Sequence, residues 1–484
     1  MNATVLTTVG PLLLIWLLIC IIIIVLLSAK FKLHPFLSII VATYAFGLGA
    51  NGIGKIAGVS KPLIGDIGGA MTGGFGKILT SIGLVIIFGT IIGKIIENSG
   101  AAITMAETVL KYIKNPALSM SIIGWVVSIP VFCDSGYVIL SSLKKSIAKK
   151  ANVNIIVLSV SLATGLYASH TFVPPTPGPI AAAGNLGIGA SDLIWVIVVG
   201  AFVSIFTALA GYLYASKFTN HLTSDLDLAT ESFEEYKKKF KRLPTTFQAF
   251  TPILLPVILM ALGSIANFPV SGVGTDHVQT LISGWLYTII NFVGQPVNAL
   301  FIGVLAAFIL LLPEKSETTL TKWVADGLLD SAIIIMITGA GAAFGAMIQA
   351  TPIADYIKSL LGGNTLFIGA GALLILFIIA ALLKTAQGST TAALIITSTI
   401  VMPLLPSLGL NTMIGNIPIG QVLAVMAIGS GAMVVSHVND SYFWVVSQFS
   451  GMKLTTAYSA QTVATLIQGI VGILITFILG LLLL

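Results

Sequence analysis

A chain of 484 residues in which 56% are hydrophobic and only 8% are charged is too apolar to form soluble globular domains, which carry roughly 25% charged residues. Many of its apolar runs approach or exceed the roughly 20 residues that a helix needs to cross a bilayer. The composition therefore predicts an all-α polytopic membrane protein. The formal net charge of +6 is attributed to lysines in cytoplasmic loops, so no nucleic-acid partner is expected.

The sequence lacks the motifs of metal or enzymatic chemistry. Its two cysteines, Cys20 and Cys133, are far apart and form neither a disulfide framework nor a Cys-x-x-Cys motif. No metal or other cofactor is expected. Paired carboxylates and the His-x-x-Glu-His spacing of metal sites are also missing, which argues against an intramembrane enzyme. A channel is a further alternative, which conductance without saturation would reveal.

The chain opens with two predicted spans, at about residues 9–27 and 35–49. Lysines follow the first span and none precedes it, so the positive-inside rule places the N-terminus outside. The glycine-rich segment 51–76 is expected to be a loop with short interfacial helices. The next predicted span covers about residues 79–96 and ends at Glu97.

Residues 116–143 are apolar but are interrupted by the sequence Ile-Pro-Val-Phe-Cys-Asp-Ser-Gly. Each half is too short to cross a bilayer alone. Lysines flank both ends of this segment, which favours the cytoplasmic side for both ends. The pattern predicts a re-entrant hairpin whose tip carries Asp134, Ser135 and Gly136.

A proline-rich break divides the next apolar stretch, residues 154–190. Residues 170–179 read His-Thr-Phe-Val-Pro-Pro-Thr-Pro-Gly-Pro, and each proline removes a backbone donor and fixes φ. Irregular backbone inside a bilayer is tolerated only where protein or a water-filled cavity covers it. Transporters build substrate sites in such broken helices, so His170, Thr171 and Thr176 are candidate site residues.

The most polar part of the chain, residues 216–246, contains a charge run at 231–242. Its basic residues place it in the cytoplasm, and the pattern favours a solvated helical linker between two halves over a lipid-binding patch. Beyond it we expect a span at 250–265, an interfacial segment at 278–293 and a returning span at 297–312.

The second half, residues 247–484, repeats the pattern of the first half, residues 1–215. A span is followed by a hairpin at 366–405, a broken helix at 419–449 and a closing span. This order, occurring twice, predicts two inverted repeats whose interruptions meet near the membrane midplane. The candidate site residues in the second-half interruptions are Gln387, Gly388, Ser389, Thr390, His437, Asn439, Asp440 and Ser441.

Ionisable side chains at membrane depth cost roughly 2.5–3.5 kcal/mol on insertion scales, so each requires a function or a partner. Histidine has an unperturbed pKa near 6.5, which suits the binding and release of protons. The alternatives are structural: helix capping for the aspartates, hydrogen bonds to freed carbonyls for the histidines and an interfacial position for the glutamate. Lys384 is expected to extend its ammonium toward the interface, and contact with the substrate is the alternative. The candidates for proton coupling are Asp134, His170, His437, Glu97 and Asp440.

Hydroxyls and backbone amides dominate the expected site. Residues 387–391 lie at a predicted helix N-terminus, where unsatisfied N–H groups attract anions. The only arginine, Arg242, lies in the charged linker. A small hydroxylated monoanion therefore fits the site better than a polyanion such as a phosphate ester.

The motif at residues 130–136, Pro-Val-Phe-Cys-Asp-Ser-Gly, and the proline motif at 170–179 resemble those of the gluconate permease family of gluconate:H+ symporters. Thr-Ala-Gln-Gly-Ser at 385–389 and Ser-His-Val-Asn-Asp-Ser at 436–441 are similar to the family's second-half motifs. The resemblance covers nearly the whole chain. It implies the fold of the ion transporter superfamily, with scaffold and transport domains, elevator-type movement and a homodimer in the bacterial cytoplasmic membrane.

The resemblance also implies a function: import of gluconate or a related sugar acid together with a proton. Some members carry D-serine or other small hydroxylated acids, which is the alternative substrate class. Sodium-coupled transport of an organic anion is a third reading, because serine, threonine and asparagine oxygens in the breaks could coordinate Na+. The sequence leaves open the substrate, the coupling ion and the residue that takes the proton.

Overall fold

The fold is described from a computed structural model of the chain. The described residues are 3–189, 192–225, 237–238, 240, 242–266, 269–270, 279–280, 284–312, 317–353, 355–356, 359, 368–437 and 440–484. This part is helical apart from the antiparallel ribbon of β1 (Pro269–Val270) and β2 (Gln279–Thr280), which confirms the all-α prediction. Among these residues, eight helices are long and apolar enough to cross a membrane, or up to ten if each of two bent pairs is one span.

The two sequence halves contribute the following elements. The first half contains α1 (Ala3–Val25), η1 (Leu26–Lys30), α2 (Pro35–Ile56), α3 (Ile67–Asn98), α4 (Ala101–Tyr112), α5 (Pro116–Val127), α6 (Cys133–Ala151), α7 (Ile155–Phe172), α8 (Pro177–Asn185) and α9 (Leu193–Phe218). The second half contains α11 (Thr246–Ala266), α12 (Gly284–Gly294), α13 (Pro296–Leu311), α14 (Glu317–Gln349), α16 (Ala370–Gln387), α17 (Thr390–Val401), η4 (Met402–Leu404), α18 (Ile419–Ala432), α19 (Ser441–Phe449), α20 (Leu454–Ala457), η5 (Tyr458–Thr462) and α21 (Val463–Leu483).

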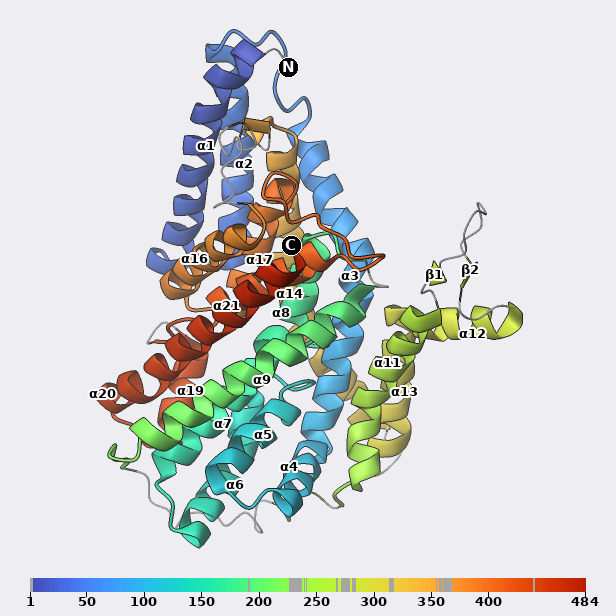
Figure 1. Cartoon of the computed structure of the whole chain (residues 1–484), viewed down its shortest axis with the longest axis vertical. Coiled ribbons are helices and arrows are strands. Elements are labelled where there is room, and N and C mark those ends of the chain that lie inside the picture. Colours follow the sequence, from blue (N-terminus) through green and yellow to red (C-terminus); the bar gives the residue numbers. More distant parts are fainter. Residues whose placement is uncertain are drawn as a thin grey trace.

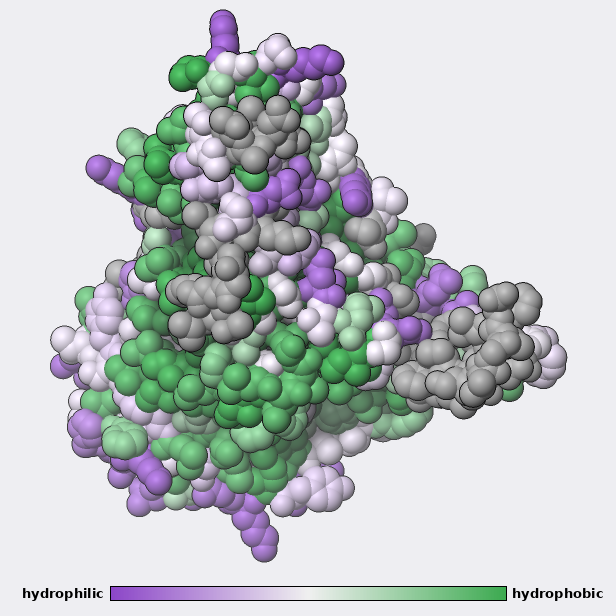
Figure 2. All heavy atoms as spheres, turned by 45° about the horizontal axis from the view of Figure 1, so that its top comes forward, coloured by the Kyte–Doolittle hydropathy of each residue, from purple (hydrophilic) through white to green (hydrophobic). Residues whose placement is uncertain are grey.

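The surface has the polarity of a membrane protein. In Figure 2 a broad apolar belt crosses the middle of the visible face, and polar residues gather toward its ends. Figure 1 shows α1 and α2 standing together at one end of the molecule, whereas α11, α12 and α13 lie at its side. The axis of α12 is bent by 72° from that of α13, in keeping with the interfacial segment expected before a returning span.

The segment 51–76, expected to be a loop, is mostly helical, because α2 continues to Ile56 and α3 begins at Ile67. One of its glycines permits close helix packing. A Cβ on Gly74 would lie 2.7 Å from the carbonyl oxygen of Ala342 in α14, a distance that real Cβ atoms do not adopt. Gly74 therefore marks a crossing of two long helices, where the sequence predicted a loop with short interfacial helices.

Two pairs of helices occupy the positions of the predicted hairpins. The pair α5 and α6 covers residues 116–151 and turns at 128–132, so it extends further than the predicted 116–143. The pair α16 and α17 turns at residues 388–389. The α5 helix has 12 residues and is too short to cross a membrane, whereas α16 has 18 and is long enough.

Both predicted breaks interrupt helices, and the first is shorter than expected. The α7 helix continues past His170 and Thr171, and the break begins only at Val173. The helix persists because these residues precede the first proline, and the N–H of Val173 still donates to the carbonyl of Ser169 at 2.9 Å. The second break lies between the end of α18 at Ala432 and the start of α19 at Ser441, and its residues 438–439 lie outside the described part of the chain.

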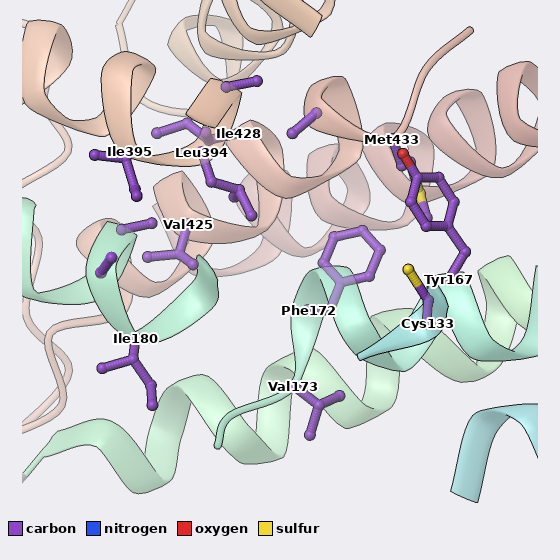
Figure 3. Packing of buried hydrophobic residues seen from close by; sticks show 14 of the residues in the cluster. Cys133, Tyr167, Phe172, Val173, Ile180, Leu394, Ile395, Val425, Ile428 and Met433 are labelled. Atoms are coloured by element: carbon purple, nitrogen blue, oxygen red, sulfur yellow. The ribbon is translucent and has the colours of Figure 1, made fainter. Parts of the chain in front are cut away.

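The α7 helix lies at the centre of the molecule, and each of its residues is buried. A Cβ on Gly124 of α5 would lie 2.6 Å from the carbonyl oxygen of Leu162, so glycine lets α5 cross α7 closely. Figure 3 shows the ring of Phe172 projecting from the end of α7 toward helices of the second half. A Cβ on Gly429 of α18 would lie 2.9 Å from that ring.

Helices of the two halves pack against one another in pairs: α3 with α14, α8 with α17, and α9 with α21. The carboxamide nitrogen of Asn185, at the end of α8, lies 3.0 Å from the hydroxyls of both Ser398 and Thr399 in α17. These contacts tie the end of the first broken helix to the second helix pair. The fold thereby brings segments more than two hundred residues apart in the sequence to one region.

The predicted linker is described only in part, since residues 226–236 lie outside the described residues. At its far end, the ammonium of Lys237 pairs with the carboxylate of Glu107 in α4 at 2.7 Å. Part of the charge run thus packs on the first half.

Candidate functional site

A cavity of about 330 Å3 lies where four chain segments meet: the start of α6, the end of α7, the turn between α16 and α17, and the start of α19. The residues that line it come from both sequence halves. Its walls are formed by Phe132, Cys133, Asp134, Tyr167, His170, Gln387, Gly388, Ser389, Thr390, Thr391, Asp440, Ser441 and Tyr442.

Three helices begin at this cavity. Cys133, Thr390 and Ser441 are the first residues of α6, α17 and α19, and all three line its wall. The first turn of a helix carries backbone N–H groups without intrahelical partners and the positive end of the helix dipole. Three such ends at one cavity favour a ligand that carries a carboxylate.

A buried ion pair joins the second helix pair to the second broken helix. The ammonium of Lys384 lies 2.6 Å from Oδ2 of Asp440, and their side chains are 0% and 6% exposed. The same ammonium donates to the carbonyl of Gly388 at 2.6 Å. Ser436 donates to Oδ2 of Asp440 at 2.5 Å, and the N–H of Tyr442 donates to Oδ1 at 3.1 Å. Asp440 is therefore both charge-paired and a helix cap.

The expectation that Lys384 reaches toward the interface is wrong, because its side chain is fully buried. The physical reason is its partner. An ammonium is tolerated in an apolar interior when a carboxylate and further acceptors surround it. Asp440 and the carbonyl of Gly388 supply those acceptors.

Three side chains on the cavity wall carry buried polar atoms that have no hydrogen-bond partner among the described residues: Oδ1 of Asp134, Nδ1 of His170 and both amide atoms of Gln387. An unpaired buried polar atom costs about 1–3 kcal/mol. The ring of His170 contacts that of Phe132, with centroids 5.6 Å apart. These groups are available to donate to or accept from a polar ligand in the cavity.

The sequence-predicted residues fall into two groups. Those that line the cavity are Asp134, His170, Gln387, Gly388, Ser389, Thr390, Asp440 and Ser441. Thr171 and Thr176 do not line it, and their hydroxyls donate to the carbonyls of Tyr167 and Val173 at 2.8 and 2.6 Å. A threonine hydroxyl in or beside a helix finds a backbone carbonyl more readily than a distant ligand.

Three further candidates, Ser135, Gly136 and His437, are described but do not line the cavity. Ser135 and Gly136 follow Asp134 in α6, and a Cβ on Gly136 would lie 2.7 Å from a methyl of Leu166. His437 lies in the second break, where Nε2 is 2.9 Å from the carbonyl oxygen of Thr385. Asn439 lies outside the described residues.

Glu97, the remaining candidate for proton coupling, lies near the end of α3. Its carboxylate is 3.3 Å from the ammonium of Lys94, which also lies 3.1 Å from the carboxylate of Asp330 in α14. Glu97 does not line the cavity. Through Lys94, Glu97 therefore belongs to the contact between α3 and α14 and not to the cavity.

Sequence reasoning missed two tyrosines of the cavity wall. The rings of Tyr167 and Tyr442 are stacked with centroids 5.3 Å apart. The hydroxyl of Tyr167 lies 2.6 Å from that of Thr390, and the hydroxyl of Tyr442 donates to the carbonyl of Ala163 at 2.8 Å. A polar aromatic residue next to each predicted break was the available signal.

A second buried lysine links α6 to α19, two of the helices that begin at the cavity. Lys144 of α6, expected at the cytoplasmic end of the hairpin, is fully buried. Its ammonium lies 2.9 Å from the hydroxyl of Ser450, 3.0 Å from that of Tyr137 and 3.2 Å from the carbonyl of Phe449 at the end of α19. The α6 and α19 helices both begin at the cavity, so Lys144 fixes their relative position.

We expect the substitution Lys144→Met to lower the melting temperature of the purified protein. Removing the amino group deletes three buried hydrogen bonds, to the hydroxyls of Tyr137 and Ser450 and to the carbonyl of Phe449, each worth about 0.5–1.5 kcal/mol. Lys149→Met on the same helix is the matched control, because Lys149 is exposed. Thermal unfolding in detergent measures both, and equal melting temperatures would contradict the structural role of Lys144.

Comparison with known proteins places this architecture among transporters. The sequence profile of one family, described as GntP family permease, matches residues 12–482. The D-serine transporter DsdX of Escherichia coli strain K12 is 32% identical over 468 residues, which cover 96% of this chain and 97% of DsdX. A gluconate permease of Zymomonas mobilis is 30% identical over 480 residues, which cover 97% of this chain and 98% of the relative.

The fold is also similar to that of a solved transporter. The crystal structure of the YdaH transporter of Alcanivorax borkumensis matches with a TM-score of 0.60 at 15% sequence identity. The match covers 84% of this chain and 86% of YdaH. At this identity the likeness concerns the fold alone.

Proposed function

The chain belongs to the GntP family of permeases, and on that premise we propose that it imports gluconate or a related sugar acid by proton symport. Two sequence-based predictions are confirmed by its relatives and its apolar helices. It is a multi-pass protein of the bacterial inner membrane, and it is a transporter rather than an enzyme.

The observation that carries the proposal is the convergence of three helix N-termini on one polar cavity without an arginine. The substrate carboxylate is proposed to lie at the first turns of α6 and α17, close to Gly388 and Ser389. Its hydroxyls would meet the unpaired amide of Gln387, the ring of His170 and the hydroxyl of Ser441. A hydroxylated monoanion uses all of these groups.

Asp134 is the proposed site of the coupled proton. Lys384 neutralises Asp440, so Asp134 is the carboxylate of the cavity wall that has no cation beside it. A substrate carboxylate about 4 Å from an ionised Asp134 would meet a repulsion of about 4 kcal/mol at an effective dielectric constant near 20. Protonation of Asp134 removes this repulsion and links anion binding to proton uptake.

The predicted residues away from the cavity wall have proposed supporting roles. Gly136 lets α6 approach α7, Thr171 and Thr176 bond to helix carbonyls, and His437 holds the turn of the second helix pair. Asn439 adjoins Asp440 in the sequence, and we propose that its side chain contacts a hydroxyl group of the substrate.

For the architecture we propose two inverted repeats, residues 1–215 and 247–484, joined by the linker 216–246. The pairs α5–α6 and α16–α17 would be re-entrant hairpins, each followed by a broken helix. This order in both halves supports the proposal. On the family resemblance we also propose an elevator-type movement of the cavity within a homodimer.

A second candidate is the transport of D-serine. It is favoured by the 32% identity to a D-serine transporter and by the uncompensated Asp134, which could pair with an amino group. A third candidate is sodium in place of the proton.

The deciding experiment is uptake of labelled gluconate into proteoliposomes under an inward proton gradient in sodium-free buffer. We expect concentrative uptake that unlabelled gluconate blocks better than D-serine does, and that a protonophore abolishes. Protein-free liposomes are the control. Stronger block by D-serine would reassign the substrate, and uptake that appears only after sodium is added would reassign the coupling ion.

A further inference from the structure

The charge of the cavity constrains what it can carry. Asp134 and Asp440 are the carboxylates of its described wall, and Lys384 pairs with Asp440 at 2.6 Å. The other titratable groups that face Asp134 are the ring of His170, the thiol of Cys133 and the hydroxyls of Tyr167 and Tyr442, all neutral near pH 7. With no ligand, the cavity therefore carries a net charge of minus one, and this charge is that of the Asp134 carboxylate.

Asp134 forms no salt bridge among the described residues, and Lys384 acts on its charge only from beyond salt-bridge distance. Its Oδ1 atom is buried and has no hydrogen-bond partner among the described residues. The ammonium of Lys384 is already engaged by Oδ2 of Asp440 and the carbonyl of Gly388. The side chain of Asp134 is thus free either to take a proton or to pair with a cation on the substrate.

We propose that the substrate's own charge decides whether a proton accompanies it, an inference that rests on the proposed function. A hydroxy-acid monoanion enters with one proton bound to Asp134. A zwitterionic hydroxy-amino acid enters with its ammonium against the ionised Asp134 and needs no proton. The ammonium replaces the coupled proton.

The balance of charge supports this rule. The empty cavity, the cavity with an anion and a proton, and the cavity with a zwitterion all carry minus one. An anion without a proton would bring the total to minus two in a buried site, which is unfavourable. Hydroxy-acid uptake is then electroneutral and driven by the pH gradient, whereas amino-acid uptake only equilibrates the two sides.

The test counts protons for two substrates. Proteoliposomes of the full chain, loaded with a pH-sensitive dye, receive labelled gluconate or labelled D-serine. We expect one proton per gluconate and none per D-serine, with gluconate accumulated under a pH gradient and D-serine equilibrated. Equal proton counts for both substrates, or no D-serine uptake, would overturn the inference. Absence of gluconate uptake would instead overturn the proposed function.

The variant Asp134→Asn is expected to affect gluconate transport and D-serine transport differently. A neutral amide resembles the protonated acid, so exchange of labelled for unlabelled gluconate across the membrane is expected to persist. D-serine loses its counter-charge, and its half-saturation concentration is expected to rise at least tenfold. Glu97→Gln, which removes a carboxylate outside the cavity, is the matched control and should keep both proton counts. A similar loss for both substrates in Asp134→Asn would contradict the assignment.

Discussion

Replacing Lys384 with Met is expected to abolish transport and to destabilise the protein strongly. The substitution leaves the carboxylate of Asp440 buried without its cation, and breaking a buried ion pair in this way costs about 3–5 kcal/mol. It also frees the carbonyl of Gly388 in the turn between α16 and α17. The melting temperature in detergent and gluconate uptake in proteoliposomes measure the two effects.

The double variant Lys384→Met with Asp440→Asn tests whether the loss of stability comes from the unpaired charge of Asp440. It removes both ions together, so we expect it to recover much of the lost melting temperature without recovering transport. Lys453→Met is the matched single control, because its pair with Asp225 is 3.6 Å long and mostly exposed. Exposed pairs contribute about 0–1 kcal/mol. If Lys384→Met melted at the same temperature as Lys453→Met, the buried pair would not support the fold.

Replacing Asp134 with Asn is expected to abolish uphill accumulation of gluconate, so that the ratio of internal to external substrate falls to one. An amide cannot bind and release the coupled proton, and the pH gradient then has no route into the transport cycle. The ratio is measured at steady state under an imposed gradient, with immunoblots to equalise the amount of protein in the vesicles.

Glu97→Gln separates this effect from a general loss of intramembrane charge. Glu97 pairs with Lys94 away from the cavity, so its substitution is expected to leave accumulation largely unchanged. Accumulation that survives in Asp134→Asn but fails in Glu97→Gln would move the proton site to the contact between α3 and α14.

The positions of the two breaks followed from local chemistry. Prolines from residue 174 onward remove helix donors, and the polar sequence around Asp440 caps a new helix. Both rules act within a few residues, so sequence alone predicted each interruption. The extent of the first break was overestimated, because the amides of His170 and Thr171 precede the prolines and remain in α7.

The partners across the cavity did not follow from local chemistry. Lys384 and Asp440 are 56 residues apart, and Tyr167 and Thr390 are 223 apart. Their contacts depend on how α7, α16 and α19 pack, which no short pattern specifies. For the same reason the burial of Lys144 was missed, since its acceptors at the end of α19 lie about three hundred residues away.

A glycine-rich segment also shows that tertiary packing can overrule a local sequence pattern. In a single chain, a glycine-rich segment such as 51–76 reads as a turn or loop. The packing partner decides otherwise, since Gly74 faces the backbone of α14 at a distance that excludes a Cβ. Only the tertiary structure distinguishes a flexible glycine from one that permits close helix contact.

Substrate protection of a single cysteine tests most directly whether this cavity binds the substrate. In a background without Cys20 and Cys133, Ser441→Cys places an exposed thiol on the cavity wall, and Ser60→Cys places one in a different exposed pocket. We expect saturating gluconate to slow the reaction of a water-soluble thiol reagent at position 441 and to leave position 60 unchanged. Equal rates at position 441 with and without gluconate, in a variant that still transports it, would contradict the assignment of the cavity.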